Sequence, residues 1–320
     1  MPDVKGREEI LKIHAKKVKL ADGVDLTRVA KLTPGSSGAD LENLINEAAI
    51  LAARRREKLV TNDDIDEARD KVFFGKERRK IMDDDQKRLT AYHEAGHALV
   101  QAVIADGKDK IHKVTIIPRG QSLGSTMFFP VKDEYTSSRN SLQNYICMCL
   151  GGRAAEEVVF GDITNGAACD IKQATKTARQ MVCDWGMSRL GAVSLSDDNP
   201  DDYVFAKPIS EKTAESVDAE VSGIIDDQLK RAVAILAERR ANLDLIASEL
   251  LLRETIDGDD VYAIVRGEFV PTNPQEWLDK KRREEDALRE RKAEEEKAER
   301  SADGAKNKPD SASPAELANA

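Results

Sequence analysis

The chain has 320 residues, of which 40% are hydrophobic, and 50 Lys and Arg against 59 Asp and Glu give a formal net charge of −9. This length allows about two domains and excludes a mini-protein that depends on disulfide staples. The acidic excess lies in residues 81–280, whereas residues 1–80 are net basic. Because an acidic surface repels phosphates, nucleic acid is not an expected partner.

Residues 6–75 predict short helices and no strand. Helices are expected at 7–18, 25–31, 39–58 and from 61 to about 72, with a turn of helix-breaking residues at 34–38. The third has the strongest apolar repeat at steps of three and four. Thr61 and the acidic residues after it predict the cap of the fourth helix.

Residues 76–85 form a charged connector, after which a helix is expected from about 84 to 105. The segment 111–129 predicts two strands joined by a loop, because β-branched and apolar residues bracket Pro118, Gly120 and Gly124. Further helices are expected at 141–160, 170–185, 211–240, 243–254 and 259–266. Gly151 and Gly152 can break the first of these.

The tail differs from the rest of the chain. Residues 281–300 contain 16 charged residues of 20 and can form a solvated helix through pairs of opposite charge. The composition of residues 301–320 predicts disorder. The chain has no run approaching the roughly 18 apolar residues that span a bilayer, and its first residues contain no apolar signal sequence. A cytoplasmic protein with no membrane span is therefore expected.

The strongest chemical signal is the sequence His93-Glu94-Ala95-Gly96-His97. Histidines four residues apart lie on one helix face, so both rings can reach one metal ion. The glutamate between them can accept a proton from a water that zinc activates. Gly96 indicates either a close backbone approach or an ordinary tolerated glycine, since glycine costs a helix about 1 kcal/mol relative to alanine.

A catalytic zinc site needs a third protein ligand and keeps one position for water. His112 qualifies only if its strand passes the site. Asp170 opens a helix after a loop of small residues, and from spacing alone a plain helix cap is the favoured reading. The four cysteines, Cys147, Cys149, Cys169 and Cys183, have no zinc-ribbon spacing and favour packed or inert thiols.

Four segments taken in order resemble the FtsH family of ATP-dependent zinc metalloproteases. They are GREEILKIHAKKVKL with TPGSSGADLENLINEAAILAARR, then HEAGH, then VTIIPRGQSLGSTMFF, and then LGGRAAEEVVFG with TNGAACDIKQATKTARQMVCDWGMS. The resemblance covers about residues 1–268. It implies a mainly α fold, with a four-helix AAA ATPase lid followed by a mostly helical zinc metallopeptidase domain that has a small β element.

The resemblance also implies domain limits. Residues 1–75 would be the lid, 76–81 a linker, 82–268 the M41-type peptidase domain and 269–320 a charged, disordered tail. The usual asparagine before the third ligand is replaced here by Cys169.

Several residue roles follow from the resemblance. His93, His97 and Asp170 would hold Zn²⁺, and Glu94 would be the catalytic base. Glu156 would orient a ligand histidine, or else be an ordinary surface charge. In the lid, His14, Gly38 and Ala39 would contact the adenosine of ATP, bound jointly with an ATPase core that is absent from this chain.

The expected function is a zinc-dependent endopeptidase that degrades unfolded or membrane-derived polypeptides, as the proteolytic half of an ATP-dependent homohexamer. The strand near residues 125–129 would hold an extended substrate by β-augmentation. The chain contains no G-x-x-x-x-G-K-[ST] motif, which favours a fragment or a truncated product without its own ATP hydrolysis. The resemblance implies a full-length protein that is membrane-anchored, with this part on the cytoplasmic side. The alternative is a non-catalytic hexamer assembly or adaptor module.

Overall fold

The computed structural model describes residues 1–77, 82–105, 107, 109–120, 122–130, 136–195, 209–283 and 286. The chain divides into two compact units, Met1–Phe269 and Val270–Ala320. In the second unit, residues 274–283 are helical. Most of the predicted solvated helix, and all of the predicted disordered end, lie outside the described residues.

The four helices expected in residues 6–75 are present, with α1 three residues earlier than expected: α1 (Val4–Ala15), α2 (Leu26–Lys31), α3 (Gly38–Arg54) and α4 (Asn62–Phe74). A polar side chain accepts a hydrogen bond from a first-turn N–H of each helix, which satisfies a donor that the helix itself cannot pair. These caps are Asp3, Asp25, Ser37 and Thr61.

Helix α3 ends earlier than predicted, at Arg54 rather than at residue 58. The amides of Arg56 and Glu57 donate to the carbonyls of Ala53 and Ala52, and Arg56 has a φ of 61°. These two bonds form a Schellman motif, which ends a helix by turning the chain into the left-handed region.

The four helices enclose one hydrophobic core, and a second core belongs to the rest of the first unit. The first core is built mainly from α3, with Leu41, Leu44, Ile45, Ala48 and Leu51. These positions repeat at three and four residues, so one face of α3 is buried against α1 and α4. The second core extends from Ala91 to Ile264.

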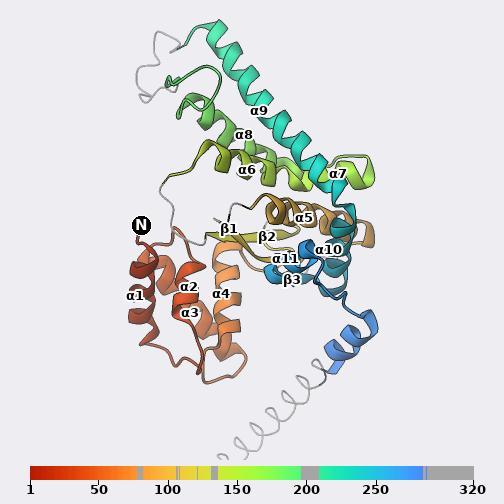
Figure 1. Cartoon of the computed structure of the whole chain (residues 1–320). Coiled ribbons are helices and arrows are strands. Elements are labelled where there is room, and N and C mark those ends of the chain that lie inside the picture. The colour runs from red at the N-terminus through yellow and green to blue at the C-terminus, as the bar shows by residue number, and fades with distance from the viewer. Residues whose placement is uncertain are drawn as a thin grey trace, which may run out of the picture. The chain divides into compact units, whose positions relative to one another are not determined.

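The second core is organised around α5 (Asp84–Ile104), which packs against α7 and α10. The remaining helices are α6 (Arg139–Cys149), α7 (Gly151–Phe160), α8 (Ala168–Cys183), α9 (Glu211–Glu238), α10 (Arg240–Arg253) and α11 (Gly258–Arg266). Figure 1 shows α6, α8 and α9 alongside one another. The predicted helix over 141–160 is broken where Gly151 and Gly152 suggested a break, between α6 and α7.

The backbones of α5 and α7 approach each other at a pair of glycines. A Cβ atom on Gly96 would lie 2.4 Å from the carbonyl oxygen of Gly151 and 2.7 Å from the Cβ of Ala155. No real Cβ occupies such a position, so residue 96 has to be glycine in this packing. The close-approach reading of Gly96 is therefore confirmed.

A small antiparallel sheet lies beside α5, with the strand order β2-β1-β3. The strands are β1 (Asp109–Thr115), β2 (Ser125–Pro130) and β3 (Thr255–Asp257). The sequence predicted the first two and missed β3, which pairs with Lys113–Thr115 of β1. The mainly α fold with a small β element agrees with the prediction.

The last turns of α4 touch the sheet through a buried carboxylate. Asp70 is 1% exposed and pairs with Arg69 at 2.8 Å and with Lys113 of β1, and Arg119 lies 3.8 Å away. Each charge on this cluster has an opposite charge next to it, as buried ions require.

Among the described residues, no helix is long and apolar enough to cross a membrane.

Candidate metal and catalytic site

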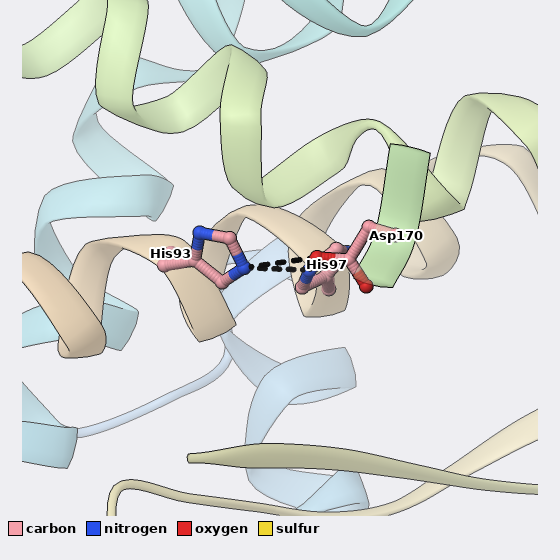
Figure 2. A group of neighbouring side chains, drawn as sticks. All are labelled: His93, His97 and Asp170. Carbon is pink, nitrogen blue, oxygen red and sulfur yellow. Dashed lines mark hydrogen bonds and ion pairs between the residues drawn. The ribbon is translucent and has the colours of Figure 1, made fainter. Parts of the chain in front are cut away.

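Two histidine rings of α5 meet one carboxylate of α8, as Figure 2 shows. His93 and His97 lie one helical turn apart, and their Nε2 atoms are 3.1 Å from each other. Oδ2 of Asp170 lies 3.3 Å from Nε2 of His93 and 3.6 Å from Nε2 of His97. Among the described residues, these three form the group that could hold a metal ion.

The structure contradicts the reading of Asp170 as a plain helix cap. Helix α8 begins at Ala168 after the short 3-10 turn Asn165–Ala167, and its N-cap is Ala167. Asp170 lies in the first turn, where the helix dipole stabilises a negative charge. Its carboxylate faces the two histidines.

The other nitrogen of each ring faces a hydrogen-bond acceptor. Nδ1 of His93 lies 2.8 Å from Oε1 of Glu156, and Nδ1 of His97 lies 2.8 Å from the carbonyl oxygen of Met148. In a ring with one proton, Nδ1 therefore carries that proton and Nε2 presents a lone pair. Two lone pairs and a carboxylate oxygen then converge.

This donor set fits a divalent ion such as zinc. Neutral imidazole nitrogens and a carboxylate are ordinary zinc ligands, at about 2.0–2.2 Å. Ligand atoms at that distance from a tetrahedral ion lie about 3.3 Å apart, which agrees with the separations of 3.1, 3.3 and 3.6 Å. Three protein ligands leave a fourth position for water or substrate.

Glu156 of α7 is 1% exposed and is not an ordinary surface charge. Its Oε1 meets His93, and its Oε2 accepts a hydrogen bond from the amide of Thr164 at 2.7 Å. The carboxylate is thus held from both ends and fixes the orientation of the His93 ring. Such outer partners orient the ligands of many metal sites.

Gly152 of α7 lies directly against the two rings. A Cβ atom there would be 2.4 Å from Nε2 of His93 and 2.6 Å from Nε2 of His97. Any side chain at this position would collide with the nitrogens that have to reach the ion. The absent side chain of Gly152 therefore gives the metal position its room.

Glu94 is held by the strand β2. Oγ1 of Thr126 donates to Oε2 of Glu94 at 2.7 Å. A Cβ atom on Gly124 would lie 2.8 Å from Oε1 of Glu94, so the chain before β2 also packs closely on the carboxylate. Glu94 is 7% exposed. Its neighbours on the sheet side restrict the conformations that its carboxylate can adopt.

In this group, neighbouring charges and hydrogen bonds shift each pKa in the opposite direction to burial. Burial lowers the pKa of His93, but hydrogen bonds to Asp170 and Glu156 and the charge of Glu94 together raise it to about 10. Burial raises the pKa of Asp170, whereas the two histidines hold it well below its usual range. The pKa of Glu156 is also lowered, because its bonds to His93 and Thr164 outweigh burial. A metal ion that binds here would therefore displace a proton from His93.

The other ligand candidates lie elsewhere. Within the described part of the chain, His112 does not belong to the converging group; its ring packs edge-on against Phe129. Burial and the charge of Arg69 lower the pKa of His112 to about 4. Cys169 is exposed next to Asp170. Cys147 and Cys149 are buried, and burial raises the pKa of their thiols to about 11 and about 12.

The predicted nucleotide contacts of the lid lie at the junction of α1 and α3. Gly38 and Ala39 are the first two residues of α3, and a Cβ atom on Gly38 would be 4.0 Å from Ile10 of α1. Nδ1 of His14 lies 3.4 Å from Oε1 of Glu42, one turn further along α3. The three residues therefore border one interhelical seam.

Sequence reasoning missed several groups of the site. Thr126, Gly124, Gly152 and the Met148 carbonyl all touch a predicted ligand or the predicted base. A backbone carbonyl leaves no trace in the residue type. In the sequence, Gly124 indicated only a loop, Gly152 only a helix break and Thr126 only a strand.

Two family models match the chain. Peptidase family M41 matches residues 80–264, and the AAA+ lid domain matches residues 23–67. The first match covers more than half of the chain and includes all three converging residues and Glu94.

The chain is also similar to curated proteins of known name. It is 46% identical over 275 residues to ATP-dependent zinc metalloprotease FtsH 2 of Methylacidiphilum infernorum, an alignment that covers 83% of this chain and 42% of that protein. It is 46% identical over 278 residues to ATP-dependent zinc metalloprotease FtsH of Magnetococcus marinus, covering 85% and 41%. For the protein of that name from Chlamydia trachomatis serovar L2, the identity is 47% over 272 residues, covering 83% and 30%. The chain thus spans less than half the length of these relatives.

Proposed function

Because the chain belongs to peptidase family M41, we propose that it is a zinc-dependent endopeptidase acting on unfolded or membrane-derived polypeptides. The observation that carries this proposal is the convergence of Nε2 of His93, Nε2 of His97 and Oδ2 of Asp170. Each histidine also has an Nδ1 partner that leaves its Nε2 lone pair for the ion.

His93, His97 and Asp170 would hold the ion, and Glu94 would move the proton. Bound zinc supplies Lewis acidity, which polarises the scissile carbonyl and lowers the pKa of a water to about 7. Glu94 accepts the proton of the attacking water at its carboxylate and returns it to the leaving amine. Thr126 holds one oxygen of that carboxylate in place, so the other oxygen takes up the proton.

The strand β2 would hold the substrate. It lies at one edge of the sheet, and in the described part of the chain no strand pairs with its outer side. An extended polypeptide can add to such an edge through main-chain hydrogen bonds. This grip tolerates many sequences, as degradation of unfolded protein requires.

The longer assembly is a further part of the proposal. The relatives carry the words "ATP-dependent" in their names and extend well beyond the aligned region. We propose that this chain acts in a homohexamer with an ATPase core, with His14, Gly38 and Ala39 touching the adenosine of ATP. The same proposal places this part on the cytoplasmic side of a membrane-anchored protein. The match to the AAA+ lid domain supports the ATPase connection.

The non-catalytic assembly module is not favoured. An adaptor needs neither a buried carboxylate behind a ligand histidine nor a clamped glutamate between the two histidines. Both are present here, as the contacts of Glu156 and Thr126 show.

Zinc analysis combined with hydrolysis of unfolded casein tests the proposed function, because an unfolded substrate needs no ATP-driven unfolding. We expect one zinc per chain and measurable hydrolysis. Glu94→Gln should retain the zinc and lose at least about 100-fold in rate, as removal of a general base does. Asp170→Ala should lose zinc. Equal hydrolysis by wild type and Glu94→Gln would refute the enzymatic function.

A further inference from the structure

A cavity of about 220 Å³ lies between α5, α6 and β2. Ala105 and Asp109 at its rim are exposed, so it opens to solvent. Sites that enclose whole small molecules measure about 300–1,000 Å³. This cavity is smaller and suits one side chain.

The cavity borders the candidate metal site on three elements. On α5, Gln101 lines it, one helical turn after His97. On α6, Met148 lines it, and the Met148 carbonyl meets Nδ1 of His97. On β2, Phe128 lines it two residues after Thr126, which holds Glu94.

The polar side chains of the cavity wall are engaged with protein atoms. Nε2 of Gln101 donates to the carbonyl of Asp109 at 3.1 Å. Nδ2 of Asn144 donates to the carbonyl of Ile104 at 3.3 Å, and its Oδ1 accepts from Arg231 at 2.8 Å. These bonds hold the wall in shape and leave its apolar atoms to meet a ligand.

Most of the other lining residues are apolar or aromatic: Ile104, Ala105, Phe128, Pro130, Tyr145 and Met148. An acidic ligand group would lose its hydration among these apolar atoms, which costs free energy unless the charge is paired.

The alternation of β2 aligns the cavity with the site. Thr126, Phe128 and Pro130 point to one face of the sheet, because side chains alternate along a strand. That face carries both the contact to Glu94 and the cavity wall. A polypeptide paired on the outer edge of β2 would present every second side chain to the same face, with directly opposite Cβ atoms about 4.5–5.5 Å apart.

We propose that this cavity is a specificity pocket, which takes an apolar side chain of the substrate that has no branch at Cβ, aromatic side chains included, within two residues of the scissile bond. The limit of two residues follows from the strand: Thr126 contacts the proposed catalytic base Glu94, and Phe128, two residues later, lines the pocket. The pocket rests on the proposed peptidase function, because it assigns a substrate position to it. The protein would thus prefer leucine, methionine or phenylalanine there and reject aspartate and glutamate.

Two variants change the size of the pocket in opposite directions. Phe128→Ala enlarges the pocket, and Ser141→Leu narrows it from the first turn of α6. The helix cap is kept in Ser141→Leu, because Ser138 accepts its hydrogen bond from the backbone amide of residue 141. Phe129→Ala is the matched control, because the neighbouring residue of the same strand points to the other face and packs on His112. Zinc content and far-ultraviolet circular dichroism report whether each variant folds and binds metal.

The measurement is the cleavage-site profile of unfolded casein by mass spectrometry, scored at each position within two residues of the cleaved bond. We expect the wild type to prefer leucine over aspartate about tenfold or more at one position, the scale that a pocket achieves. Phe128→Ala should move that position toward tryptophan and phenylalanine, and Ser141→Leu toward alanine. Phe129→Ala should leave its preference unchanged. An unaltered preference in both pocket variants would overturn the pocket and leave the peptidase function intact.

If no cleavage occurs, a binding measurement distinguishes the proposed pocket from the proposed peptidase function. Fluorescent peptides with leucine, alanine or aspartate at the mapped position, or at each central position in turn, are titrated into Glu94→Gln with and without Phe128→Ala. Binding that depends on the side chain and changes with residue 128 would support the pocket while the enzymatic function failed. Binding without any side-chain preference would overturn the pocket.

Discussion

The hydroxyl of Thr126 donates a hydrogen bond to Oε2 of Glu94 over 2.7 Å and thereby joins a sheet edge to the helix that carries both histidines. In the part of the chain that the structure describes, no strand pairs with the outer edge of the same strand. The residue that positions the proposed base therefore belongs to the element that would bind the substrate. This arrangement makes the orientation of Glu94 separable from metal binding.

Thr126→Val tests this separation. A hydrogen bond to a charged group contributes about 1.5–3 kcal/mol, so we expect kcat to fall about 10–100-fold. KM and zinc content should stay near their wild-type values, and Thr126→Ser should restore kcat because it returns the hydroxyl. A loss of kcat that serine does not rescue would indicate that the methyl group's packing matters and not the hydrogen bond.

Glu156→Gln should weaken zinc binding without abolishing it. Glutamine keeps the shape of the side chain but removes the charge that Nδ1 of His93 meets, and such changes behind a ligand cost about 10–100-fold in metal affinity. Competition with a chelating dye measures the affinity. Glu157→Gln is the matched control, because Glu157 is the next residue of α7 and is exposed. This variant should bind zinc as the wild type does.

Gly152→Ala should remove the metal while leaving a folded protein. The new methyl carbon would lie 2.4 and 2.6 Å from the two Nε2 atoms, so the rings have to move apart. Gly223→Ala is the control: among the described residues outside its own stretch of helix, only Arg189 would lie within 4 Å of a Cβ atom on this glycine of α9, at 3.8 Å. The Gly223→Ala variant should retain zinc, and alanine should stabilise the helix by about 1 kcal/mol. Full zinc occupancy in Gly152→Ala would contradict the geometry.

The sequence predicted local features well because local rules produce them. The helix that carries His93 and His97 follows from its apolar periodicity and from the acidic residues that cap it. The convergence of the two rings is a consequence of helical spacing alone. The break between α6 and α7 follows likewise from two adjacent glycines.

Features that depend on distant partners were not predictable from spacing. Asp170 is 77 residues from His93, so only the fold brings them together, and spacing alone favoured a helix cap. The strand β3 has three residues, too few to show alternation, and its partner β1 lies about 140 residues earlier. The family resemblance supplied Asp170, whereas nothing in the sequence pointed to β3.

Acid should destabilise the protein in part through Asp70. Burial raises the pKa of this carboxyl, but its bonds to Lys113 and Arg69 outweigh burial and lower it below the ordinary value. Because the folded state binds this proton less readily than the unfolded state, the stabilisation is present above about pH 4 and is lost as the pH falls through the folded pKa.

Urea unfolding of the wild type and Asp70→Asn, compared from pH 7 to pH 3, measures this contribution. At pH 7 the variant should lose free energy of unfolding near the lower end of roughly 3–5 kcal/mol, because Lys113 and Arg119 keep some exposure. The difference between the two proteins should shrink below about pH 4. A difference that is constant with pH would show that the Asp70 charge is not responsible.

The contact of Asp70 with Lys113 also links α4 to the candidate site through the sheet. Lys113 pairs with Met127 across the two strands, and the next residue, Val114, pairs with Thr126. Asp70 of α4 is thus linked to Glu94 across one strand pair, whereas the Nδ1 partners of the two histidines lie on α6 and α7. Glu94 and both histidines share α5, but the Glu94 side chain is held from the sheet and the rings are held from these two helices. A substitution in the sheet can therefore reorient the proposed proton acceptor while the partners of His93 and His97 stay in place.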